Sequence, residues 1–239
     1  MLALLLAAGL ALVHVVAGWL RFLDVQPRSR WLSFASGISV AYVFAHLLPE
    51  LADGQRAIAE VEATGGVVRE GHVWLLALLG LAVFYGLERA AKASREERRR
   101  EGQEDETEPG VFWLHIASFA LYNVLVGYLL AEGGGAHGRA VFWVAMALHF
   151  FVNDYGLRQL HREQYGHAGR WLLAAAVLVG AALGLTVEVG EAVFAALVAF
   201  LGGGVVLNVL KEELPEERES RFWPFAAGAA AYAALLTVV

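Results

Sequence analysis

The sequence predicts an all-helical membrane protein, a single bundle of eight transmembrane helices. Of its 239 residues, 58% are hydrophobic and 18% are charged, which is more apolar than the core of a soluble domain of this size requires. The apolar stretches are also long enough to cross a bilayer, which takes about 20 helical residues. Lysine and arginine gather in alternate connections between these stretches, as they do in membrane proteins.

The predicted spans are, in chain order, residues 2–22, 31–52, 72–92, 111–131, 139–160, 170–187, 190–210 and 222–239. The first span has no basic residue before its apolar run, unlike a signal peptide, and we expect it to be retained as a helix. Residues 93–110 carry a basic run and then an acidic run, which indicates a solvated linker. The chain has no cysteine, which excludes disulfides, thiolate metal ligands and a thiol nucleophile.

The distribution of basic residues predicts the orientation. All but three of the 18 lysines and arginines lie in the first, third, fifth and seventh connections, the exceptions being Arg56, Arg69 and Arg139. Cytoplasmic loops are enriched in such residues. We therefore expect an integral protein of the plasma (inner) membrane, with both termini outside and residues 93–110 in the cytoplasm. Seven tryptophans close to the span ends, where aromatic rings anchor at the headgroups, agree with these boundaries.

A short internal repeat predicts a second level of organisation. Leu48-Pro49-Glu50 ends the second span and recurs as Leu214-Pro215-Glu216 after the seventh, and these two spans should cross the membrane in opposite directions. Three spans precede the central pair and three follow it. This arrangement favours an inverted 3+2+3 repeat in one transmembrane domain, in which residues 1–92 and 170–239 flank a central pair at 111–160. A chance match is the alternative, because proline commonly ends helices.

Transporters built as inverted repeats bind their substrate near the midplane, between the halves. Polar residues at that depth in the fourth and fifth spans are Tyr122, Asn123, His149, Asn153 and Asp154. His149 and Asn153 are four residues apart and share a helix face, so both can point at one ligand. A central aspartate costs about 3 kcal/mol in a membrane and needs a partner. A ligand site is one interpretation. In the other, His149 hydrogen-bonds Tyr122 or Asn123, and Asp154 pairs with Arg158.

These features resemble the ZIP (zinc/iron-regulated transporter-like) family. The resemblance rests on the eight spans, the outward termini, the cytoplasmic loop after the third span and the ending His46-Leu47-Leu48-Pro49-Glu50 of the second span. It implies a 3+2+3 inverted repeat and a divalent metal ion as cargo. In the family the metal binds His-Asn-x-x-Asp-Gly in the fourth span and His-Glu-x-Pro-Glu/His in the fifth.

The fourth-span motif is only partly kept. The corresponding stretch retains Asn123 and Gly127, but Tyr122 stands in place of the family's histidine and Val126 in place of its aspartate. Two expected ligands are therefore missing.

The fifth-span motif is also weakened. His149 is kept, whereas Phe150 replaces the glutamate, Val152 the proline and Asn153 the final ligand. A divalent ion in a low-dielectric bundle needs anionic oxygens or several imidazoles. The sequence therefore favours, over a binuclear site, a weaker mononuclear site of His149, Asp154 and an acid from the second or seventh span.

Further polar residues are candidates for an entry or exit path: His46, Glu50, His115, Asn208, Glu212 and Glu213. Capping and local salt bridges at the span ends are the alternative roles for the acidic residues. We expect His14, a lone histidine on an apolar helix, to be a packed and hydrogen-bonded group. The glycines of the sixth and seventh spans, among them Gly180 and Gly203, are expected to allow close helix packing.

Three functions follow from these residues. The first is a ZIP-like transporter of a divalent metal or another ion, with a weakened central site. The second is a relative that does not transport and acts as a structural or regulatory membrane component. The third and least favoured is an intramembrane metal hydrolase, because catalytic zinc usually has three protein ligands and His149 is the one central imidazole. We expect no enzymatic activity and no nucleic acid partner. Lipids and a metal or other small ion are the expected partners, and small-residue spans with the family precedent favour a homodimer.

Overall fold

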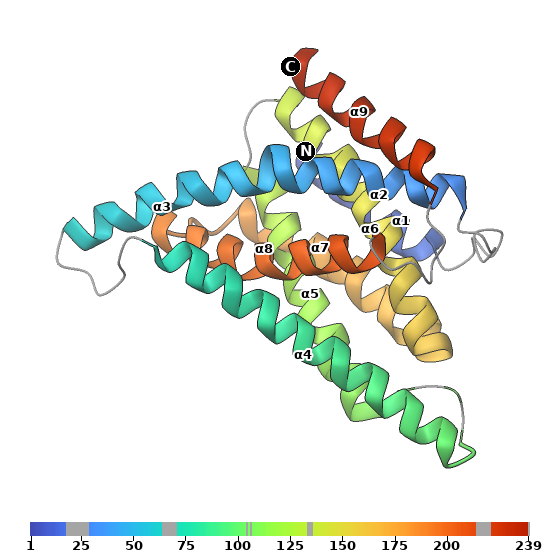
Figure 1. The fold of residues 1–239 in the computed structure, drawn as a ribbon. Helices are drawn as coiled ribbons and strands as arrows, with labels where there is room; N and C mark the ends of the chain where they lie inside the picture. The colour runs from blue at the N-terminus through green and yellow to red at the C-terminus, as the bar shows by residue number, and fades with distance from the viewer. Residues whose placement is uncertain are drawn as a thin grey trace.

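The computed structural model describes residues 1–17, 29–63, 71–103, 105, 107–132, 136–213 and 221–238. These residues form helices joined by turns, with no strand among them (Figure 1). The elements are α1 (Leu2–Ala17), α2 (Arg30–Tyr42), η2 (Val43–Leu47), α3 (Leu48–Ala63), α4 (His72–Arg100), α5 (Pro109–Glu132), α6 (Ala136–Gln164), η3 (Tyr165–Gly169), α7 (Arg170–Gly184), α8 (Glu191–Glu213) and α9 (Phe222–Val238). The prediction of an all-helical fold is confirmed.

Five helical stretches in the described part of the chain are long and apolar enough to cross a membrane. They are Arg30–Arg56, His72–Arg100, Pro109–Glu132, Gly138–Gly184 and Glu191–Lys211. The helices α1 and α9 are apolar but shorter. These helices are compatible with a membrane bundle, whereas the eight spans, the repeat and the orientation of the termini stay predictions.

The second predicted span continues past its expected end. The segments α2, η2 and α3 form one run of helix, so the chain remains helical through Leu48-Pro49-Glu50 and on to Ala63. Pro49 has no N–H to donate to the preceding turn. The wide π-helical turn Val43–Leu47 lies just before it, as expected where a proline interrupts the regular ladder of hydrogen bonds.

The fifth and sixth predicted spans are joined by helix rather than by a loop. Residues 138–184 would make a straight helix about 70 Å long, more than twice the hydrocarbon thickness of a bilayer. Arg162 breaks this run, because its φ of 51° and ψ of −120° are not helical. The segment beyond the break, α7, packs mainly against α5 and α1.

Three helix pairs hold the bundle together: α5 with α7, α4 with α8, and α2 with α9. Each pair meets at glycines on both helices. In the α4–α8 pair, a Cβ on Gly80 would overlap the carbonyl of Phe200, and one on Gly203 would overlap the carbonyl of Ala77. Gly180 lies equally close to the backbone of α5. The expectation that glycines of the sixth and seventh spans allow close packing is confirmed.

The connection between α4 and α5 is short and tied to the bundle. Helix α4 runs to Arg100 and α5 begins at Pro109, so residues 101–108 alone lie outside these helices. Arg95 of α4 donates two hydrogen bonds to Asp105, at 2.7 and 2.8 Å, and a third to the carbonyl of Gln159 in α6. The backbone N–H of Glu108 donates to Ser94. The basic part of the expected linker is therefore the end of helix α4. Asp105, in the acidic part, binds to this helix through Arg95.

Substituting Gly203 with alanine should destabilise the bundle. The added methyl group would force α8 away from α4, and overpacking of this kind costs about 1–3 kcal/mol. We expect a lower thermal unfolding midpoint for the detergent-solubilised protein, measured by tryptophan fluorescence. Gly86→Ala is the control, because a Cβ on Gly86 of α4 meets no atom within 4 Å. Equal midpoints for Gly203→Ala and Gly86→Ala would contradict the packing.

The contact of Asp105 should respond to acid. Hydrogen bonding from Arg95 is the main reason that the pKa of Asp105 lies below its ordinary value, with the charges of Arg95 and Arg162 adding to it. A lowered pKa means that the contact is complete above about pH 3.9, the ordinary aspartate pKa. It is lost as the pH falls through the lowered pKa.

Hydrogen–deuterium exchange of residues 101–108, corrected for its intrinsic pH dependence, measures this response. Asp105→Asn should raise exchange at neutral pH about two- to fivefold, the range of an exposed ion pair. Glu101→Gln in the same connection is the control and should leave exchange unchanged. Unchanged exchange in Asp105→Asn would show that the contact does not hold the connection.

Candidate functional site

A small polar cavity lies between α2, α6 and α8. Its volume is about 10 Å³, enough for roughly one water molecule. Its polar lining residues are Ser36, Ser39, His149, Asn153 and Asn208. The structure therefore brings together three residues that the sequence singled out, His149 and Asn153 from the central pair and Asn208 from the path, and adds two serines of α2.

Two atoms of these lining residues lack a hydrogen-bond partner. The Nε2 atom of His149 and the Nδ2 atom of Asn153 are both buried and unpaired. Leaving a buried polar group unpaired costs about 1–3 kcal/mol, so such groups call for water or a ligand. Tyr122 does not pair with His149 through its hydroxyl group. Its ring packs edge-on to the imidazole, with centroids 5.9 Å apart.

Asp154 points to a different partner. Its carboxylate oxygens lie 2.8 and 3.0 Å from Nδ1 of His14 in α1, and both side chains are fully buried. His14 is a partner that the sequence did not assign to Asp154, and the pairing of Asp154 with Arg158 stays a prediction. The expectation that His14 is packed and hydrogen-bonded is confirmed. A carboxylate in a predicted span needs a polar partner at the same depth in the membrane. The presence of His14 in the first predicted span was the feature of the sequence that pointed to such a partner.

The amide of Asn123 completes this arrangement. Its Nδ2 donates to the carbonyl of Phe119, at 2.8 Å, so its oxygen faces Nε2 of His14, 2.7 Å away. An oxygen acceptor at that position requires a hydrogen on Nε2. The other ring nitrogen, Nδ1, faces the carboxylate of Asp154. His14, Asn123 and Asp154 are thus joined through their side chains and link α1, α5 and α6.

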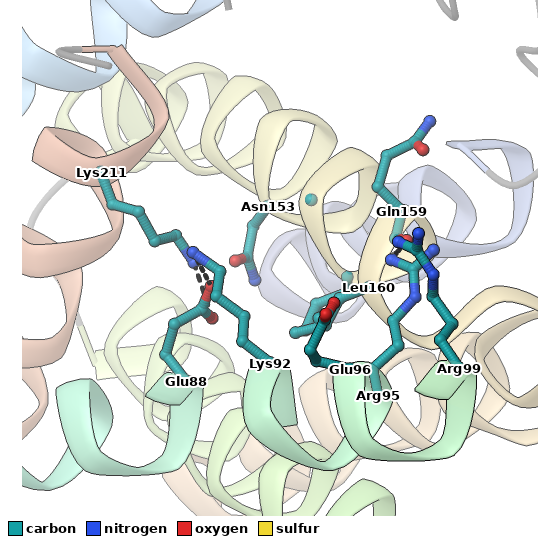
Figure 2. Close-up of a pocket in the computed structure, with 11 residues that line it drawn as sticks. Glu88, Lys92, Arg95, Glu96, Arg99, Asn153, Gln159, Leu160 and Lys211 are labelled. Atoms are coloured by element: carbon teal, nitrogen blue, oxygen red, sulfur yellow. Dashed lines mark hydrogen bonds and ion pairs between the residues drawn. The ribbon is translucent and has the colours of Figure 1, made fainter. Parts of the chain in front are cut away.

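A larger pocket opens at the end of the bundle that carries the C-terminal turns of α4, which we call the basic end. Its volume is about 300 Å³, and it lies between α4, α6 and α8. Figure 2 shows Glu88 between two lysines, with Lys211 donating at 3.0 Å and Lys92 at 3.2 Å. Asn153 lines this pocket and also the small cavity. The two spaces therefore meet at one side chain.

A chain of histidines runs beside this pocket. His115 of α5 lies with Nε2 3.9 Å from Glu88. Its Nδ1 is 2.8 Å from Nε2 of His161, whose Nδ1 is 2.7 Å from the hydroxyl of Thr107. These contacts of His115 run toward the α4–α5 connection, and its role in a polar path stays a prediction. Sequence reasoning missed Glu88, Lys211 and His161, because their distant positions meet only in the folded bundle.

Toward the opposite end the spaces are apolar, and a pocket of about 750 Å³ lies there between the first turns of α4 and α8. A cavity of about 20 Å³ there is lined by Tyr42, Glu50 and Tyr122 among mostly apolar side chains. His46 stacks on Tyr42, with ring centroids 5.4 Å apart. Of the predicted central residues, Tyr122 thus faces this cavity rather than the one that His149 and Asn153 line.

The predicted metal ligands do not gather into one cluster. Among the residues that the structure describes, no three histidine, aspartate or glutamate side chains lie close enough to hold a metal ion. The backbone of α8 ends at Glu213, and Leu214-Pro215-Glu216 lies outside the described residues, as do the side chains of Glu212 and Glu213. The mononuclear site that includes an acid from the seventh span stays a prediction.

Comparison with known proteins adds no relative to this picture. No protein-family model matches the chain, and no curated protein sequence matches it.

Breaking the pair in the bundle centre should cost much stability. The variant His14→Leu leaves the buried side chain of Asp154 without its partner. Breaking a buried pair in this way lowers the free energy of unfolding by about 3–5 kcal/mol. The thermal unfolding midpoint should fall sharply. In the double variant His14→Leu/Asp154→Leu, much of this loss should be recovered, because an apolar pair leaves no charge unpaired. A double variant no more stable than His14→Leu would contradict the pairing.

Proposed function

We propose that this protein is a ZIP-like membrane transporter of a small ion, with its path open at the basic end and closed at the opposite end. One observation carries the proposal: Asn153 lines both the 300 Å³ pocket at the basic end and the small cavity of His149. An ion that enters this pocket meets buried, unpaired polar atoms at its inner limit. By the distribution of arginine and lysine, the basic end faces the cytoplasm.

The packing of the helices supports the inverted repeat of eight spans. The tripeptides that begin at Leu48 and Leu214 are 166 positions apart in the sequence. The same separation relates Gly37 of α2 to Gly203 of α8. Both glycines pack against the backbone of another helix. Gly37 meets α9 at Phe225, and Gly203 meets α4 at Ala77. In a 3+2+3 repeat, α2 corresponds to α8 and α9 to α4, so the two contacts would be equivalent.

The glycine on the other helix of each pair agrees with the same symmetry. Gly228 of α9 packs on the carbonyl of Phe34 in α2, and Gly80 of α4 packs on that of Phe200 in α8. The offset of 166 relates Phe34 to Phe200 as well. These two matched helix crossings support a repeat that extends beyond the tripeptide.

The lining of the small cavity sets the class of cargo. The donors there are an imidazole, two amides and two hydroxyl groups, none of which is a carboxylate. These neutral groups cannot offset two positive charges. A divalent metal ion would therefore bind here more weakly than at a carboxylate site and would keep part of its water. A site that binds the cargo ion weakly favours release of the ion over its storage.

A second function, a membrane component that does not transport, is favoured by a different observation. The buried carboxylate of Asp154 pairs with His14, whose other ring nitrogen contacts Asn123, and the cavity beside His149 holds only about 10 Å³. Both features suit a bundle whose central polar residues serve packing.

Flux into proteoliposomes separates the two functions. Wild-type protein should conduct at least one of zinc, manganese, iron, cobalt, nickel, cadmium or a monovalent ion above protein-free vesicles. Asn153→Leu and Asn208→Leu should each lower this flux about tenfold or more, as loss of a hydrogen bond to a charged group predicts. Thr186→Val at the end of α7 removes a polar group outside the path and is the control. Absence of flux for every ion tested would refute transport and favour the second function.

A further inference from the structure

The pocket at the basic end presents a row of charged side chains. Glu88, Lys92, Arg95 and Arg99 of α4 follow one another at spacings of four, three and four residues, so they lie on one helix face. All four line the pocket, together with Lys211 of α8. Figure 2 shows the ammonium groups of the two lysines together at the carboxylate of Glu88, and the two arginines further along α4 toward Gln159.

The carboxylates around this pocket already have cationic partners. Glu88 is held by both lysines. Glu96 pairs with Arg100 at 3.3 Å, and Asp105 pairs with Arg95 and Arg162. The pocket lining thus carries four cationic side chains and two carboxylates, and it has an excess of positive charge.

Arg99 contributes most to this excess. Its guanidinium group makes no hydrogen bond or ion pair of its own with the described residues, although its charge helps to lower the pKa of Asp105. Arg95, one turn away, is already engaged by Asp105 and the carbonyl of Gln159. No described residue takes the donors of Arg99, and the ammonium group of Lys92 stays exposed beside its ion pair with Glu88, so both can bind an anion in the pocket.

The depth of the pocket points to the level of the lipid headgroups. Helix α4 has 29 residues, which is about 43 Å, whereas the hydrocarbon core is about 30 Å thick. The apolar part of α4 lies before Glu88, so its charged last turns project beyond the hydrocarbon. Basic pockets between transmembrane helices on the cytoplasmic side bind anionic headgroups.

We propose that the pocket between α4, α6 and α8 binds a phosphate group through Arg99 and Lys92. A planar guanidinium group can bind two phosphate oxygens at once, and an ammonium group adds a compact charge. The phosphate belongs either to an anionic phospholipid of the inner leaflet or to a soluble phosphate compound. This inference does not depend on transport.

Two binding measurements on the purified full chain test the site and separate the two sources. The first is calorimetric titration with inorganic phosphate in detergent, at constant ionic strength set with sodium chloride. The second is native mass spectrometry of lipid adducts after exposure to phosphatidylglycerol or, for comparison, phosphatidylcholine. Binding of phosphate in the first measurement indicates a soluble ligand. Preferential retention of phosphatidylglycerol without binding of free phosphate indicates a lipid headgroup.

The double variant Lys92→Gln/Arg99→Gln should weaken whichever binding occurs about tenfold or more, because each side chain donates a charge-assisted hydrogen bond. Glu88 keeps Lys211 as its partner when Lys92 is replaced, so the double variant leaves no buried charge unpaired. Arg56→Gln/Arg139→Gln changes the net charge by the same amount away from the pocket and should bind as wild type does. Arg99→Lys keeps the charge but loses the planar fork, and its binding should be intermediate.

Two results would overturn the proposal. One is that neither inorganic phosphate nor phosphatidylglycerol binds to the wild-type protein more strongly than chloride or phosphatidylcholine. The other is that the Lys92→Gln/Arg99→Gln variant and its control lose affinity equally, which would mean that general surface charge attracts the anion.

Discussion

Helices in a bilayer gain little from covering one another's apolar side chains, because the surrounding hydrocarbon is equally apolar. Close backbone contact must supply the association instead, and here it does so at glycines. Gly37, Gly80, Gly203 and Gly228 each pack against the backbone of another helix. These contacts fix α2 to α9 and α4 to α8. Gly127 and Gly180 join α5 to α7 in the same way.

At that centre, the polar side chains fall into two groups with different roles. His14, Asn123 and Asp154 satisfy one another, so they hold three helices together without needing a ligand. His149 and Asn153 have unpaired atoms and line a cavity. Two residues next to each other in sequence, Asn153 and Asp154, therefore serve opposite purposes, because adjacent positions on a helix point about 100° apart.

The two ends of the bundle are unlike each other. One has a 300 Å³ pocket with paired carboxylates and an excess of cations, and the spaces toward the other are apolar. In a transporter this asymmetry would correspond to a state open to one side. In a membrane that α4 crosses, the basic pocket would stand at the level of the lipid headgroups. A phosphate site there and an ion path toward Asn153 would share a wall, so occupancy of the first could influence the second.

The sequence by itself determined the helical class and the location of nearly every helix, because apolar length and the placement of charge are local properties. The sequence also identified His149, Asn153 and Asn208, because they are polar residues within predicted spans. The fold brings these three residues together. The partner of Asp154 was decided by the tertiary structure, since His14 is 140 residues away. The tertiary structure also decided the pocket that Glu88 and Lys211 line, because these two residues are 123 positions apart in the sequence. The continuation of helix through Pro49 and the break at Arg162 likewise depend on neighbouring helices, which override the local preferences that sequence patterns report.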